Sequence, residues 1–157
     1  MATLQTPAPT RVAPEAREVN IELIAAALYE NFNFRRVDES AEWVARHCEW
    51  LDVPSGTMFL GPEGYLAFAQ KWLDAFPDAW LEVTSVIGRG DRVVSELIAR
   101  GTHGGPLIGP TEQIIEATGR HVEMRCSEVL EIENGQIVRA RFYYDALTVL
   151  RQLGVVT

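Results

Sequence analysis

The chain has 157 residues, 47% of them apolar, which suits one domain built around one hydrophobic core. Its formal net charge of −8 argues against nucleic acid, whose protein partners carry basic patches, and against an anionic membrane surface. No apolar run is long enough to cross a bilayer, no secretory leader is apparent, and Cys48 and Cys126 lack disulfide or zinc spacing, so we expect a cytoplasmic protein without a metal site.

The first half of the chain predicts mainly helices. Residues 1–14, rich in Thr, Pro and Ala, predict a disordered tail, and residues 15–157 predict one folded domain. Apolar residues at helical spacing predict a helix over 15–31. A short second helix is expected over 38–46, followed by a strand over 47–53.

Gly61-Pro62-Glu63 is typical of a helix start and predicts a helix as far as Phe76. Its aromatic stripe, which we expect to face the core, consists of Tyr65, Phe68, Trp72 and Phe76. Everything beyond it alternates as strands do. We expect strands over 79–87, 93–103, 120–133 and 136–144, a long loop over 104–119 that could serve as a lid, and a short helix over 146–153. Asn134-Gly135 predicts a tight hairpin. Helices followed by a run of strands indicate an α+β fold, with helices on one face of a curved antiparallel sheet.

Glu128 is a candidate catalytic residue because it occupies the apolar face of its predicted strand, between Cys126 and Leu130. A buried carboxylate needs a partner or a raised pKa. It could therefore belong to a pocket. It could equally form a structural hydrogen bond or ion pair, or a local bulge could turn it outward.

Two further residues are candidates for acid/base chemistry. His103 ends the apolar face of its strand and could donate to a substrate oxygen, or it could be a satisfied histidine at a strand end. Asp145 follows the last strand, where it would make a good helix N-cap, and strict alternation places it opposite Phe142 and Tyr144. The apolar walls of a pocket are predicted to come from Phe34, Trp50, Phe76, Met124 and Tyr144.

Three stretches carry a family pattern in their order and spacing. The first is Gly61-Pro62-Glu63-Gly64 with Phe76-Pro77-Asp78. The second is Gly90-Asp91-Arg92-Val93-Val94 with Gly101-Thr102-His103-Gly104-Gly105. The third is Asn134-Gly135-Gln136-Ile137-Val138 with Asp145 and Leu150-Arg151-Gln152-Leu153-Gly154. In these stretches the chain resembles the SnoaL-like polyketide cyclase (ester cyclase) branch of the nuclear transport factor 2-like superfamily.

The resemblance implies a conical α+β barrel, a homodimer packed through its sheet, and a pocket that works without a cofactor. It also implies that Asp145 acts as the acid/base group and that His103 contacts the substrate. Arg141 departs from the pattern, because many relatives carry Trp there, so the substrate of this chain could differ. The fold does not fix the reaction.

The leading functional hypothesis is an enzyme that acts on an apolar, carbonyl-bearing small molecule by aldol chemistry like that of polyketide cyclases. Asp145 would move a proton next to the carbonyl, and His103 with Glu128 would stabilise the enolate oxygen. One alternative is an epoxide hydrolase-like or ketosteroid isomerase-like reaction in the same pocket. Another is a non-catalytic module for small-molecule binding or dimerisation.

Overall fold

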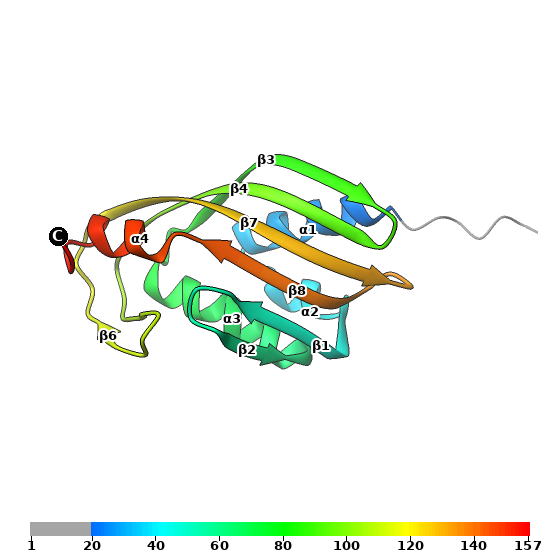
Figure 1. Cartoon of the computed structure of the whole chain (residues 1–157), viewed down its shortest axis with the longest axis horizontal. Helices are drawn as coiled ribbons and strands as arrows, with labels where there is room; N and C mark the ends of the chain where they lie inside the picture. The colour runs from blue at the N-terminus through cyan, green and yellow to red at the C-terminus, as the bar shows by residue number, and fades with distance from the viewer. Residues whose placement is uncertain (1–19) are drawn as a thin grey trace, which may run out of the picture.

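The computed structural model describes residues 20–157, so the predicted tail over 1–14 lies outside the described residues. The chain runs in the order α1 (Ile21–Asn33), α2 (Val37–Ala41), β1 (Val44–Asp52), β2 (Thr57–Leu60), α3 (Gly61–Ala75), β3 (Trp80–Arg89), β4 (Arg92–Thr102), β5 (Leu107–Ile108), β6 (Ile114–Ile115), β7 (His121–Glu133), β8 (Gln136–Tyr144) and α4 (Ala146–Gln152) (Figure 1). None of the helices in this part of the chain is long and apolar enough to cross a membrane.

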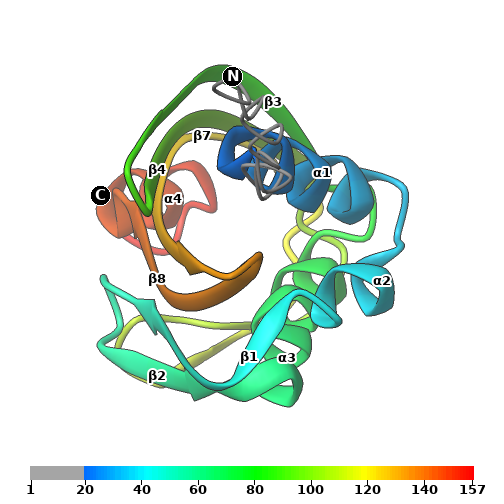
Figure 2. The same cartoon turned by 90° about the vertical axis from the view of Figure 1, so that its right-hand side faces the viewer.

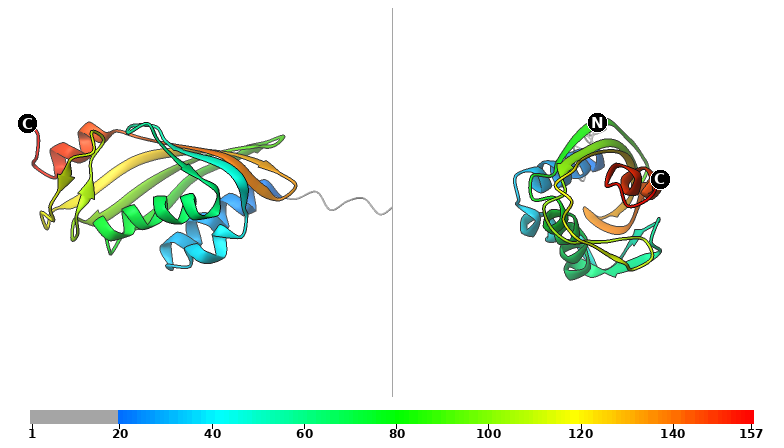
Figure 3. Two further views of the ribbon diagram at one scale, coloured as in Figure 1. Left: turned by 90° about the horizontal axis from the view of Figure 1, so that it is seen from below. Right: turned by 90° about the vertical axis from the view of Figure 1, so that its left-hand side faces the viewer.

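Six strands form one sheet in the order β2-β1-β8-β7-β4-β3. All neighbours in it pair antiparallel except β1 and β8, which run parallel. The sheet curves strongly without closing, and the N-terminal helices and α3 lie along its open side (Figures 2 and 3). The predicted α+β fold, with a curved sheet wrapped around helices, is confirmed.

One predicted boundary and one predicted alternation were wrong for tertiary reasons. The helix predicted over 38–46 ends at Ala41, because Val44 already pairs with Ile137 of β8. The alternation predicted for 79–87 breaks at a bulge between Val83 and Ser85, after which Ile87 faces solvent with 65% of its surface exposed. Neither pairing with a distant strand nor a bulge leaves a clear mark in local periodicity.

The central strands follow their sequence pattern closely. Val93, Ser95 and Leu97 of β4 are buried, and the predicted β7–β8 hairpin turns at Asn134 and Gly135, both with positive φ. Strict alternation therefore sets which side chains of β4, β7 and β8 enter the concave face of the sheet.

The segment over 104–119 is more ordered than a plain loop. It contains the short β5–β6 hairpin, with Leu107 and Ile115 buried. The N–H groups of Gly104 and Gly105 both donate to the carbonyl oxygen of Ala75, at distances of 2.9 and 3.2 Å, which fixes the segment to the end of α3.

Because of this close approach to α3, an added side chain should destabilise the protein at Gly105 but not at Gly104. A Cβ atom at Gly105 would lie 2.0 Å from the carbonyl oxygen of Asp74, whereas one at Gly104 would make only ordinary contact, with its nearest atom in Pro77 at 3.4 Å. We expect Gly105→Ala to lower the free energy of unfolding by about 1–3 kcal/mol, the usual cost of overpacking. Gly104→Ala, the matched control, should stay within about 1 kcal/mol of the wild type in urea denaturation. Equal stability of the two variants would contradict this account.

Candidate functional site

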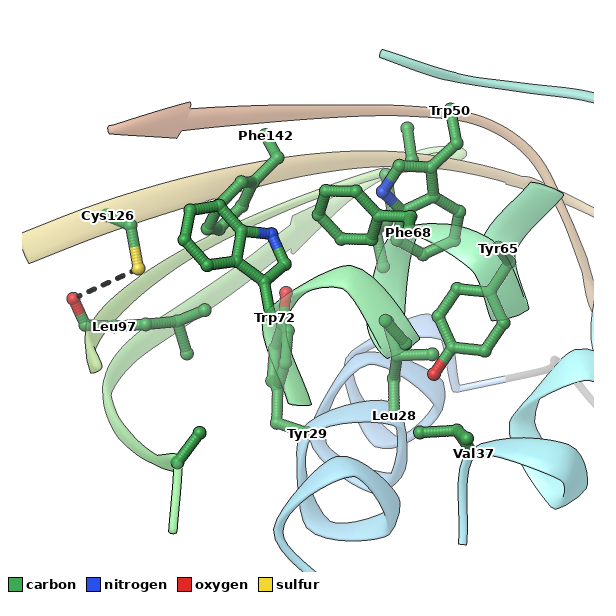
Figure 4. Close-up of a cluster of buried hydrophobic side chains, with 14 of the residues drawn as sticks. Leu28, Tyr29, Val37, Trp50, Tyr65, Phe68, Trp72, Leu97, Cys126 and Phe142 are labelled. Carbon is green, nitrogen blue, oxygen red and sulfur yellow. Dashed lines mark hydrogen bonds between the residues drawn. The ribbon is translucent and has the colours of Figure 1, made fainter. Parts of the chain in front are cut away.

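A cavity of about 80 Å³ lies between α1, α3 and the concave face of the sheet. Its walls are largely aromatic and aliphatic, and several of these side chains are drawn in Figure 4. The lining residues are Leu28, Tyr29, Phe32, Tyr65, Phe68, Ala69, Trp72, Phe76, Ala79, Leu81, Leu97, Ala99, Arg100, Gly101, Val122, Met124, Glu128, Phe142 and Val149.

Glu128 provides the carboxyl group of this cavity. It is only 3% exposed, and the hydroxyl of Tyr29 donates to its Oε1 atom at 3.1 Å. On the neighbouring strands it is paired with Ser95 and Phe142, so no cation lies opposite it in the sheet. Burial raises the pKa of Glu128 to about 8, although the Tyr29 hydrogen bond opposes this shift. Glu128 therefore lies on the buried face of β7, and of the alternatives left open by the sequence, the outward-turning bulge is absent while the hydrogen bond is present.

Two residues that line the cavity on the side of α3 carry buried hydrogen-bond donors. The indole Nε1 of Trp72 and the hydroxyl of Tyr65 are buried, and neither has a hydrogen-bond partner among residues 20–157. Sequence reasoning assigned both to an aromatic core stripe. Helical spacing cannot distinguish a ring that fills the core from one that borders a cavity.

The structure places His103 behind the cavity lining. Its ring is buried against Phe76, with ring centroids 5.4 Å apart. Its Nδ1 atom accepts from the backbone N–H of Thr118 at 3.1 Å and lies 3.0 Å from the Thr118 hydroxyl oxygen. Burial lowers the pKa of His103, which favours the neutral ring. In this arrangement His103 ties the end of the 104–119 segment to β4.

Asp145 lies on the exterior and caps α4. Its Oδ1 accepts from the Thr148 N–H at 3.1 Å, and its Oδ2 accepts from the Thr148 hydroxyl at 2.6 Å. These hydrogen bonds lower the pKa of Asp145. Asp145 does not line the cavity that contains Glu128. Together with Tyr143, Tyr144 and Arg125, it borders a separate, more polar hollow of about 490 Å³ formed by β3, β4, β7 and β8.

The predicted wall residues divide into two groups. Phe76 and Met124 line the cavity. Trp50 is buried behind the lining, 4.8 Å from the Tyr65 ring between centroids. Phe34 is 57% exposed and packs edge-on against Trp80, while Tyr144 packs against the edge of Trp72. The structure therefore brings together Glu128, Phe76 and Met124, but not Asp145, His103, Phe34, Trp50 or Tyr144, around the cavity.

A buried ion pair escaped sequence reasoning. The Nζ atom of Lys71 lies 2.6 Å from Oδ2 of Asp52, whose side chain is fully buried, and 5.0 Å from the centroid of the Trp72 ring. The only sequence signal was an acidic residue directly before the turn at Pro54, where a surface position is the ordinary expectation. No group of three or more His, Cys, Asp or Glu side chains in the described part of the chain is arranged to hold a metal ion.

The profile of the SnoaL-like polyketide cyclase family matches residues 22–153, nearly the whole described chain. The chain belongs to this family. No curated protein matches it. The family resemblance carried by the three sequence stretches is thus confirmed, as is the family's mixed fold around helices.

Three solved structures illustrate the range of its structural relatives. A candidate SnoaL-like polyketide cyclase from Jannaschia sp. CCS1 is 19% identical with a TM-score of 0.77, and the match covers 92% of this chain and 100% of that one. IdmH, a candidate polyketide cyclase from Streptomyces antibioticus, is 29% identical with a TM-score of 0.71, with coverage of 86% and 99%. A candidate ketosteroid isomerase from Kribbella flavida is 18% identical with a TM-score of 0.59, with coverage of 79% and 76%.

The burial of Glu128 predicts a pH-dependent stability. Because the folded-state pKa is about 8 and the ordinary value is 4.5, the folded protein holds a proton that the unfolded chain releases between these values. The contribution of Glu128 to the stability of the wild type should therefore fall as pH rises from about 4.5 to 8, by about 1.4 kcal/mol per unit. Glu128→Gln removes this loss, so its stability relative to the wild type should increase over that range in urea denaturation.

Glu133→Gln, an exposed change at the end of the same strand, is the matched control and should run parallel to the wild type at every pH. If the Glu128→Gln difference were also independent of pH, Glu128 would not carry a raised pKa.

Proposed function

We propose that this protein is a cofactor-free enzyme that uses Glu128 as the acid/base group on a neutral, carbonyl-bearing small molecule held in the apolar cavity. The observation that supports this most directly is a buried carboxyl group with a pKa near 8, bordering a cavity that has no other carboxyl in its lining. Acid/base catalysts work best when their pKa lies near the operating pH. Membership of a family of polyketide cyclases agrees with this class of chemistry.

The chemistry begins with proton abstraction. With a pKa of about 8, roughly a tenth of Glu128 is ionised at pH 7, and this carboxylate removes a proton from the carbon next to the substrate carbonyl. In an aldol cyclisation the resulting enolate carbon bonds to a second carbonyl carbon of the same molecule. The proton held on Glu128 then passes to the new alkoxide oxygen. The aldol addition is redox-neutral, so it needs neither an oxidant nor a reductant.

A ketosteroid isomerase-like reaction would begin with the same step. There the proton would return to another carbon of the conjugated system, and no carbon–carbon bond would form. The similarity in fold to the candidate ketosteroid isomerase supports this second possibility. Proton removal next to a carbonyl is common to both reactions, and it is the step that the cavity supports.

The charges around the cavity favour an uncharged substrate. Arg100 is the one basic residue in the lining, and its guanidinium is already paired with Glu82 at 2.6 Å and Glu123 at 2.9 Å on the exposed side of the sheet. A carboxylate or phosphate inside the cavity would therefore lack a counter-charge and would lie near Glu128. Homodimer formation and a cytoplasmic location remain predictions.

A simple ketone tests the proton-transfer step without the natural substrate. In D₂O, the wild type should accelerate deuterium exchange at C2 of 1-indanone, followed by the loss of its proton NMR signal. Glu128→Gln should slow the protein-dependent exchange by about 10²–10⁴-fold, the usual contribution of a general base. Asp145→Asn should change it little, because Asn caps a helix as well as Asp does and residue 145 lies outside the cavity.

The same assay therefore decides whether Glu128 or Asp145 is the base. Loss of exchange in Asp145→Asn with full exchange in Glu128→Gln would reject Glu128 and support the role implied for Asp145 by the family resemblance. Thermal melting of both variants controls for unfolding.

The same assay has an expected pH profile. Because the ionised form of Glu128 is the base, protein-dependent exchange should rise with pH and level off above about 8. After subtraction of the rate in buffer, a plateau already reached near pH 5 would contradict a buried base. It would instead indicate a carboxylate with an ordinary pKa.

A further inference from the structure

We infer that Trp72 is a substrate-binding residue whose indole Nε1–H donates a hydrogen bond to the carbonyl oxygen of the ligand in the cavity. This inference rests on the proposed function for the kind of ligand, and it adds the group that binds the ligand's oxygen. Trp72 belongs to α3, so it acts from the helical wall, whereas Glu128 acts from β7.

The first observation is the unpaired donor itself. Trp72 is nine-tenths buried, its Nε1 has no hydrogen-bond partner in the described chain, and it lines the cavity. Buried donors in native proteins are nearly always paired with protein, water or ligand. An indole nitrogen can only donate, so its missing partner must be an acceptor. A carbonyl oxygen in the cavity meets this requirement.

The second observation is how firmly the ring is held. Trp72 packs against Phe76 and Phe142, with ring centroids 6.4 and 6.1 Å away, and both of these residues also line the cavity. Figure 4 shows the indole among the cavity side chains, with its nitrogen on the edge of the ring toward Phe68. A donor fixed by its neighbours needs little reordering when a ligand arrives.

The third observation is the cation beside the indole. Lys71 Nζ lies 5.0 Å from the ring centroid and is held there by the buried carboxylate of Asp52. A cation over the face of an indole ring is attracted to its π electrons, so this contact helps to hold the Trp72 ring in place. The ion pair that sequence reasoning missed thus helps to position the group that would meet the ligand's oxygen.

The ligand that fits these three observations is a neutral molecule. Its carbonyl oxygen points toward α3, and the carbon next to the carbonyl lies near Glu128. Negative charge that develops on the oxygen during proton removal would strengthen the Trp72 hydrogen bond. Such a bond stabilises the enolate more than the bound ketone, which is the condition for lowering the barrier.

The experiment compares 1-indanone with indane, which has the same two rings but no oxygen. In ¹⁵N–¹H spectra of the wild type, 1-indanone should move the Trp72 indole proton downfield, and indane should not. Trp72→Phe and Trp50→Phe assign the two resonances. Trp50 is the internal control, because its Nε1 is also buried and unpaired but lies behind the cavity lining, so its response should not distinguish the two ligands.

Affinity provides a second readout. In calorimetric titrations, Trp72→Phe should lower the preference for 1-indanone over indane by roughly threefold to tenfold, the equivalent of one neutral hydrogen bond, while Trp50→Phe keeps the preference. An unchanged preference in Trp72→Phe, equal shifts of the Trp72 proton with both ligands, or no binding of 1-indanone up to its solubility limit would overturn the inference. If Trp72→Phe fails to fold, Trp43→Phe, Trp50→Phe and Trp80→Phe assign the Trp72 resonance by exclusion, and the wild-type spectra still decide the question.

The outcome is separable from that of the proposed function. Deuterium exchange retained in Glu128→Gln, together with a ketone-specific Trp72 shift, would reject the base and keep the donor. Exchange lost in Glu128→Gln, without a ketone-specific shift, would keep the base and reject the donor.

Discussion

Glu128 places a carboxyl group on the concave face of the sheet, where Tyr29 donates to it and no cation lies opposite it on the neighbouring strands. Taking an ionised carboxylate out of water is costly, so such a group keeps its proton to an unusually high pH. The strand fixes its position, because β7 is paired on both sides. The cavity is therefore bordered by a carboxyl group that is mostly neutral near pH 7, with a small ionised fraction that can act as a base.

The surrounding structure separates this carboxyl group from the other wall of the cavity. Glu128 extends from β7, while Trp72 extends from α3 and is steadied by its aromatic neighbours and by Lys71. Because the sheet curves without closing, α3 and α1 complete the enclosure. A molecule between the two walls would meet a proton acceptor on one side and a hydrogen-bond donor on the other, with apolar side chains elsewhere.

His103 and Asp145, the two other candidates for acid/base chemistry, have structural roles in this chain. The neutral ring of His103 accepts a hydrogen bond from the Thr118 N–H that closes one end of the 104–119 segment, and Asp145 begins α4. Gln152 then fixes α4 to β7, since its side-chain amide both donates to and accepts from the backbone of Glu123. Parts of the family pattern around Gly101–Gly105 and Leu150–Gly154 therefore have direct structural reasons in this chain.

The sequence by itself determined what depends on neighbouring residues. Period-two alternation predicted the buried face of β4 and the inward position of Glu128, and the outward position of Asp145 followed from the same parity. Asn134-Gly135 predicted the hairpin, and Gly61-Pro62 predicted the start of α3. These features depend on backbone geometry over a few residues, so a single sequence is enough to recognise them.

Tertiary structure alone decided the composition of the site. Tyr29 and Glu128 lie 99 positions apart in the chain, and only the curvature of the sheet brings α1 to β7. The early start of β1 depends on pairing with β8, and the exposure of Ile87 depends on a bulge. Whether an aromatic ring fills the core or borders a cavity depends on how elements distant in sequence pack together, and hydrophobic spacing is the same in both cases.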